Sequence, residues 1–240
     1  MLITGFAAGM FATNCYVVAE QPGSEAVIID PGQDSAAQVR SVLAEHSLTP
    51  VAVLLTHGHL DHTWDAADLC DEYSIPAYIH PEDRPMLADP ASGIGPALGS
   101  VIGGMVFREP EKVIDFVDGD AIELAGIGFD VAAAPGHSRG SVLLTVDVAV
   151  DDRTVPVCFS GDVLFAGSIG RTDLPGGDHE QLLTSIATTL LRRPDDTQVL
   201  PGHGEQTTVG RERATNPFLV GLPGVSDAAA DSPTKGRHGL

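Results

Sequence analysis

The stretch that decides the fold of this chain is Thr-His-Gly-His-Leu-Asp-His at residues 56–62, directly after the apolar run of residues 51–55. It places three imidazoles and one carboxylate within seven residues. Imidazole nitrogens and carboxylate oxygens are ligands that suit zinc, iron and manganese. Four such groups in so short a loop cannot converge on one tetrahedral ion without severe strain. We therefore expect them to serve two adjacent ions.

The same arrangement of an apolar run and a glycine-bearing turn recurs along the chain. The runs and the polar residues that follow them are 26–29 before Asp30, 129–134 before His137, 155–159 before Asp162, and 199–200 before His203. Continuous apolar runs predict strands that are covered on both faces. Helical periodicity lies between them, over residues 35–47 and 179–191. This alternation predicts an α/β fold whose site gathers at the C-terminal ends of strands.

Three of these turns supply the ligands that residues 56–62 lack, because each presents a donor directly after a glycine. The predicted metal ligands are His57, His59, Asp61, His62, His137, Asp162 and His203. A carboxylate can bridge two cations about 3.5–4 Å apart, and such cations lower the pKa of a bound water toward neutrality. The remaining histidines are interpreted as ordinary polar residues, with His80 as a candidate neighbour of the site.

These combined motifs resemble the metallo-β-lactamase superfamily and, within it, the glyoxalase II (hydroxyacylglutathione hydrolase) group. The segment of residues 168–179 is similar to small single-domain bacterial members. The resemblance implies an α/β, metallo-β-lactamase-like αββα four-layer sandwich over residues 1–222. It also implies that His57, His59 and His137 hold one metal, that Asp61, His62 and His203 hold the second, and that Asp162 bridges them. The polar, Gly- and Pro-rich residues 223–240 are predicted to be a disordered C-terminal tail.

Departures from the family pattern concern the substrate. The main lactamase branch has a cysteine ligand where Asp162 stands, so lactamase activity is not expected. Arg171 matches a lysine that holds glutathione in the related enzymes, but Asp173 and Glu205 stand where tyrosines are found. Arg171 is the candidate substrate-binding residue, and it either clamps a substrate carboxylate or pairs with Asp173.

The function implied by this resemblance is a binuclear metallohydrolase, specifically a thioesterase. The expected cofactors are two divalent metal ions, zinc first, with iron and manganese as alternatives. A hydroxide bridging the metals would attack the thioester, with Asp61 and Asp162 as the catalytic carboxylates. The alternatives are a mononuclear iron persulfide dioxygenase, which would use His57, His137 and Asp162, and a lactone hydrolase. A non-catalytic metal-binding protein is disfavoured, because structural zinc sites are closed and cysteine-rich.

Composition limits the partners. The chain has 240 residues, 13 Lys and Arg against 33 Asp and Glu, and a net charge of −20. This balance argues against nucleic acid and anionic membranes and leaves a small molecule, an acylated thiol, as the expected partner. Three cysteines without a paired motif fit reduced thiols in the cytoplasm. The apolar residues 1–19 lack a basic segment and are interpreted as a first strand.

Overall fold

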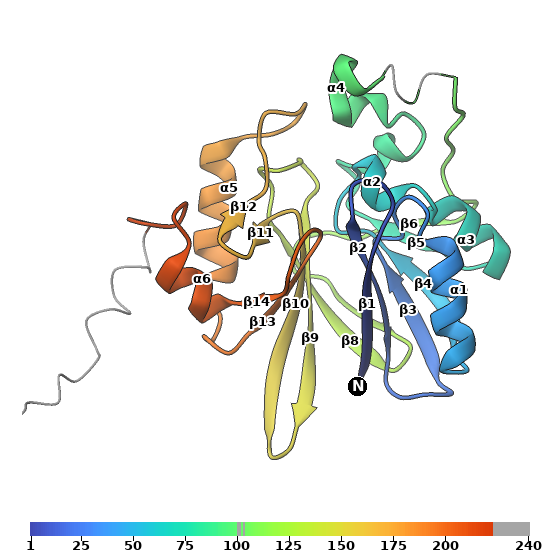
Figure 1. Cartoon of the computed structure of the whole chain (residues 1–240), viewed down its shortest axis with the longest axis horizontal. Helices are drawn as coiled ribbons and strands as arrows, with labels where there is room; N and C mark the ends of the chain where they lie inside the picture. Colours follow the sequence, from blue (N-terminus) through green and yellow to red (C-terminus); the bar gives the residue numbers. More distant parts are fainter. Residues whose placement is uncertain (100–101, 103, 223–240) are drawn as a thin grey trace, which may run out of the picture.

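The computed structural model describes residues 1–99, 102 and 104–222, so the predicted tail of residues 223–240 lies outside the described residues. Two six-stranded sheets pack face to face, and helices cover both outer faces (Figure 1). The blue and cyan helices lie on one side of the sheets, and the orange and red helices lie on the other. This is the αββα sandwich that the sequence predicts.

The first sheet has the strand order β1-β2-β3-β4-β5-β6. Its strands are β1 (Leu2–Ala8), β2 (Thr13–Ala19), β3 (Glu25–Ile29), β4 (Thr49–Leu54), β5 (Ala77–Ile79) and β6 (Val113–Asp115). The first three strands are antiparallel, and β3 to β6 are parallel. The single strand predicted over residues 1–19 is wrong, because the chain reverses between β1 and β2. Gly9 has φ +68° in that turn, a conformation that glycine adopts without steric cost.

The second sheet has the order β14-β13-β10-β9-β8-β7. Its strands are β7 (Ala121–Leu124), β8 (Ile127–Ala133), β9 (Val142–Val150), β10 (Arg153–Gly161), β13 (Gln198–Pro201) and β14 (Thr207–Thr208). A separate two-stranded hairpin joins β11 (Leu164–Phe165) to β12 (Ser168–Ile169). Strand β10 is parallel to β13 and antiparallel to β9, and β9 is antiparallel to β8. The strands β8, β10 and β13 therefore end at the same edge.

The helices are α1 (Ala36–Glu45), α2 (Leu60–Thr63), α3 (Ala66–Tyr73), the 3₁₀ turn η1 (Arg84–Leu87), α4 (Ala91–Gly99), α5 (His179–Ser185), the π-helical turn η2 (Ile186–Leu190) and α6 (Val209–Thr215). The two predicted helical segments, residues 35–47 and 179–191, contain α1 and α5 with η2, whereas the other helices were not predicted from the sequence. The segment of residues 81–105 contains η1 and α4. Non-helical backbone at Gly95 interrupts α4. No helix among the described residues combines the length and apolarity that a membrane crossing requires.

Three hydrophobic layers hold the sandwich together. Alternate residues of β3 show the principle, because Ile28 packs toward α1 whereas Val27 and Ile29 face the second sheet. The third layer joins β9, β10 and β13 to α5, η2 and α6. The predicted double coverage holds for the inner strands but is wrong for much of β8. That strand lies beside the edge strand β7, and its Asp130 is exposed.

Backbone hydrogen bonds join the two sheets at the edge where the polar turns lie. The Asn14 amide donates to the Gly202 carbonyl at 2.7 Å, and the Val142 amide donates to the Thr56 carbonyl at 2.9 Å. These bonds fix the turns after β4 and β13 against strands of the opposite sheet. This edge is where the predicted ligands meet.

Candidate metal centre

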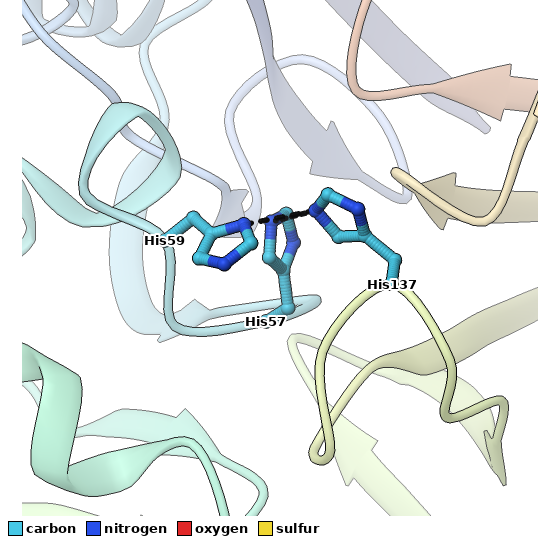
Figure 2. A group of neighbouring side chains, drawn as sticks. All are labelled: His57, His59 and His137. Carbon is cyan, nitrogen blue, oxygen red and sulfur yellow. Dashed lines mark hydrogen bonds between the residues drawn. The ribbon is translucent and has the colours of Figure 1, made fainter. Parts of the chain in front are cut away.

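The first group of predicted ligands consists of three buried histidines from two strand ends. His57 and His59 follow β4, and His137 follows β8. Figure 2 shows their ring nitrogens pointing toward one another. His137 Nε2 lies 2.9 Å from His59 Nδ1 and 3.2 Å from His57 Nε2. Nitrogens on a tetrahedral zinc ion at 2.0–2.1 Å stand about 3.3 Å apart, so this spacing suits one shared cation.

The second group combines one carboxylate with two histidines. Asp61 and His62 lie on the short helix α2, and His203 follows β13. Asp61 Oδ2 lies 3.2 Å from His203 Nε2 and 3.6 Å from His62 Nε2. The three ligand atoms lie within 4.8 Å of one another. The four donors of residues 56–62 are thus divided between two groups.

Asp162 lies between the two groups, after β10. Its Oδ1 is 3.3 Å from His62 Nε2. Its Oδ2 is 3.6 Å from His137 Nε2 and 3.5 Å from His203 Nε2. One carboxylate therefore contacts a histidine of each group, which is the position that a bridging ligand requires.

The hydrogen bonds on the far side of four histidines settle which nitrogen faces the centre. In each case Nδ1 lies beside an oxygen, so in the neutral ring Nδ1 carries the proton and Nε2 is the nitrogen available to a metal. The partners are Thr56 Oγ1 for His57 at 3.1 Å, Asp30 Oδ2 for His62 at 3.0 Å, the Arg171 carbonyl for His137 at 2.8 Å and the Phe11 carbonyl for His203 at 3.1 Å. Because the Thr56 hydroxyl donates to Asp30 at 2.6 Å, its oxygen is available to accept from His57.

Two buried polar atoms that lack hydrogen-bond partners test whether a metal fits these donors. His62 Nε2 and Asp162 Oδ1 are buried and have no hydrogen-bond partner. A buried polar atom left in this state costs about 1–3 kcal/mol. A cation among the converging nitrogens and oxygens would satisfy both atoms. The fold and these His and Asp groups together imply that the protein binds divalent metal ions.

Comparison with known proteins identifies the family of this chain. A family model described as "Metallo-beta-lactamase superfamily" matches residues 8–203. The chain belongs to the metallo-β-lactamase superfamily. An uncharacterized protein of Mycobacterium tuberculosis is 52% identical over 223 residues, 92% of this chain and 99% of the relative. The hydroxyacylglutathione hydrolase GloC of Haemophilus influenzae is 34% identical over 87% of this chain and 93% of its own.

Two solved structures of this superfamily bear on the site. The crystal structure of BLEG-1, described as a B3 metallo-β-lactamase, is 39% identical with a TM-score of 0.77, covering 92% of this chain and 100% of its own. TTHA1623, described in a di-iron-bound form, is 36% identical with a TM-score of 0.71, and the match covers 90% of this chain and 100% of its own.

The electrostatics of this superfamily member differ between the two groups. Burial, with repulsion from His62 and His137, lowers the pKa of His57 well below its ordinary value. Burial and His137 likewise lower the pKa of His59 to about 3. At His62 burial opposes the charge, but Asp162 and Asp61 prevail and raise its pKa well above the ordinary value. Charge is therefore disfavoured on His57 and His59, whereas the carboxylates beside His62 favour it.

Two glycines allow the strand ends to approach this closely. Gly161 has φ +47°, and a Cβ there would overlap the Thr56 side chain. A Cβ on Gly202 would overlap Asp162 Oδ1 and lie 2.5 Å from His62 Cε1. Side chains at these two positions would displace candidate ligands or their support. The glycines of the predicted turns thus have a steric role in the site.

Two buried carboxylates that support the ligands were not predicted to have this role. Asp83 accepts from the Gly58 amide at 2.9 Å, the Ser138 hydroxyl at 2.6 Å and the Gly140 amide at 2.7 Å. It therefore ties the His57–His59 turn to the His137 turn. Asp30, at φ +50°, accepts from the Thr56 amide and from His62. Asp30 was noted as a polar residue after an apolar run, whereas no sequence signal marked Asp83. His80 has no hydrogen bond to any candidate ligand among the described contacts.

A cavity of about 620 Å³ opens above the candidate ligands. His59, Asp61, His137, Asp162 and His203 line its floor, and Arg171 lines its side. The Arg171 guanidinium donates from Nε and Nη2 to the two carboxylate oxygens of Asp173, at 2.7 and 2.8 Å. The same pairing lowers the pKa of Asp173 to about 2. Of the two interpretations left open for Arg171, this structure displays the ion pair.

Proposed function

We propose that this protein is a binuclear metallohydrolase that cleaves thioesters. The observation that carries the proposal is the position of Asp162 between two complete three-residue ligand groups at the floor of the cavity. Adjacent sites of this kind suit hydrolytic chemistry. The name of the Haemophilus relative, a hydroxyacylglutathione hydrolase, supports a thioester as the substrate.

The proposed ligands are those of the sequence argument. His57, His59 and His137 would hold one cation, Asp61, His62 and His203 would hold the other, and Asp162 would bridge them. When bound, two divalent cations, zinc in this proposal, would polarise a carbonyl oxygen and lower the pKa of a water to near neutrality. We propose that the domain extends over residues 1–222.

The chain's own residues organise the substrate around this centre. Asp61 and Asp162 line the cavity together with the candidate ligands His59, His137 and His203, so a substrate that enters the cavity would reach the proposed centre. The cavity walls limit the access of bulk water. In the reaction, a water oxygen bonds to the acyl carbon, the carbon–sulfur bond breaks, and the sulfur leaves with a proton as the thiol.

The principal alternative is a mononuclear iron oxygenase that would use His57, His137 and Asp162. The second group argues against it, because Asp61, His62 and His203 also converge although such an enzyme does not need them. A lactone or β-lactam substrate would meet the same centre as a thioester. Substrate assays must therefore include these classes.

The test combines metal analysis with a substrate panel. The purified protein should contain about two divalent ions per chain, and it should hydrolyse thioesters faster than lactones or β-lactams. Chelation should abolish turnover, and addition of the same metal should restore it. One bound iron with oxygen consumption in the presence of a persulfide would overturn the proposal, as would two bound metals without thioester turnover.

A further inference from the structure

The walls of the cavity are apolar from the ligands outward. They include Met10 and Phe11 from the β1–β2 turn, Leu60 and Trp64 at the two ends of α2, and Phe165 and Ile169 from the β11–β12 hairpin. The Phe165 ring packs edge-on against the ring of the candidate ligand His203, with centroids 6.1 Å apart. Trp64 packs in the same manner on Phe107, with centroids 5.3 Å apart. Apolar surface therefore begins beside the reaction centre itself.

The rim continues this apolar surface into solvent. Met10 and Phe11 are exposed, and so is Met105, which also lines the cavity. Exposed apolar patches at the mouth of a cavity mark a binding surface for an apolar ligand. A volume of about 620 Å³ lies within the range of pockets that enclose drug-sized molecules. The cavity thus has room for a chain of several carbons beyond the reacting carbonyl.

The cavity offers little to a negatively charged substrate. Among the described residues that line it, Arg171 is the single Lys or Arg, and its Nε and Nη2 donate to Asp173. A substrate carboxylate would compete with Asp173 for that guanidinium. The net charge of −20 also repels anions approaching from solution.

We infer that the preferred substrate is a thioester with an apolar acyl chain on an uncharged thiol, rather than an ester of an anionic peptide thiol such as glutathione. This inference rests on the proposed thioesterase function. Its basis is the apolar wall around the candidate ligands together with the paired state of Arg171. Water supplies the oxygen and both protons of the products, a carboxylic acid and a thiol, and no oxidant is needed.

The first experiment separates the two halves of the substrate in the metal-loaded enzyme. Acetyl, butyryl, hexanoyl and octanoyl thioesters are compared on N-acetylcysteamine, which is uncharged, and on glutathione. We expect kcat/KM to rise with chain length by up to about fourfold per buried methylene. At equal chain length, we expect the N-acetylcysteamine ester to be favoured at least about tenfold.

The outcomes distinguish the inference from the function on which it rests. Equal or faster turnover of the glutathione esters, or a rate that does not change with chain length, overturns the inference and leaves the thioesterase intact. No turnover of any ester by the fully metal-loaded enzyme overturns both.

Two variants test the walls and the ion pair separately. Met10→Ser changes an exposed wall residue and should raise KM for the octanoyl ester severalfold, with a smaller change for the acetyl ester and no loss of metal.

Asp173→Asn frees Arg171 and should raise the ratio of glutathione-ester to neutral-ester kcat/KM at least about threefold, an effect that salt screens. Asp130→Asn, an exposed change on β8, is the matched control for charge. An unchanged ratio in Asp173→Asn would show that the ion pair does not set specificity.

Discussion

The two ligand groups differ in depth and in charge. His57, His59 and His137 are all buried and carry no carboxylate among them. In the second group, the side chains of Asp61 and His203 are 21% and 28% exposed. The first group offers three buried imidazoles to its cation, whereas the second includes a carboxylate and a histidine that are partly open to solvent and to competing ligands. The difference predicts that the first group keeps its metal longer.

The hydrogen bonds that hold the ligands in place also differ between the two groups. The first group is fastened by Asp83, a buried carboxylate with three hydrogen bonds to the ligand turns. In the second group, the buried Asp30 contacts His62, but the Nδ1 proton of His203 goes to the carbonyl of Phe11, which lies in an exposed turn. Since outer partners orient metal ligands, the more rigid support should correspond to the higher affinity.

The largest effect is expected where the two groups meet. Asp162→Ala removes the carboxylate that contacts both ligand groups. The binding of both metals should therefore be weakened or lost, and turnover should fall by more than about 10³-fold. Metal analysis and thioester kinetics measure the two effects together. Asp130→Asn serves as the control. Two tightly held metals with normal turnover in Asp162→Ala would rule out its role as a bridge.

Single-ligand variants test whether the groups are separate. His137→Ala should abolish the first site and His203→Ala the second, so that each variant retains about one metal and loses more than about 10²-fold in turnover. In the unmodified protein, a chelator titration should remove one metal equivalent before the other. If His203→Ala released both metals as readily as His137→Ala, the proposed difference in affinity would be wrong.

A smaller effect is expected from the support of the first group. Asp83→Asn keeps the shape of the side chain but places an amide donor against the Gly58, Ser138 and Gly140 donors. We expect a loss of about 1–3 kcal/mol in the free energy of unfolding, measured with denaturant. Metal affinity at the first site should fall about 10- to 100-fold. Ser138→Ala removes only one of the three bonds and should lie between this variant and the unmodified protein.

The smallest effect is expected at the edge of the second group. The Thr13 hydroxyl donates to Asp61 Oδ2 over 3.4 Å, at the long limit of a hydrogen bond. Thr13→Val preserves the side-chain volume and should change metal affinity and turnover by less than about twofold. A loss as large as that of Asp83→Asn would mean that the second group depends on its outer contacts as strongly as the first.

Much of this architecture was predictable because local sequence patterns indicate it. The apolar runs and the glycine turns located β3, β4, β8, β10 and β13, and the 3.6-residue period located α1 and α5. The candidate ligands were named because each follows a strand end. The hairpin of β1 and β2 was missed, because its turn at Gly9 lies inside an apolar stretch without a polar interruption. The alternating exposure of β8 follows from its neighbour β7, which its own sequence does not encode.

The sequence by itself determined the chemistry of the centre, since the spacing of donors and glycines limits which groups can meet at strand ends. Only the tertiary structure decided the support and the substrate space. Asp83 meets Ser138 and Gly140 from 55 and 57 positions away, and His203 meets Phe11 across 192 positions. The cavity wall is likewise assembled from separate turns and the short helix α2. Contacts between distant segments depend on how the sheets pack, and no local pattern records them.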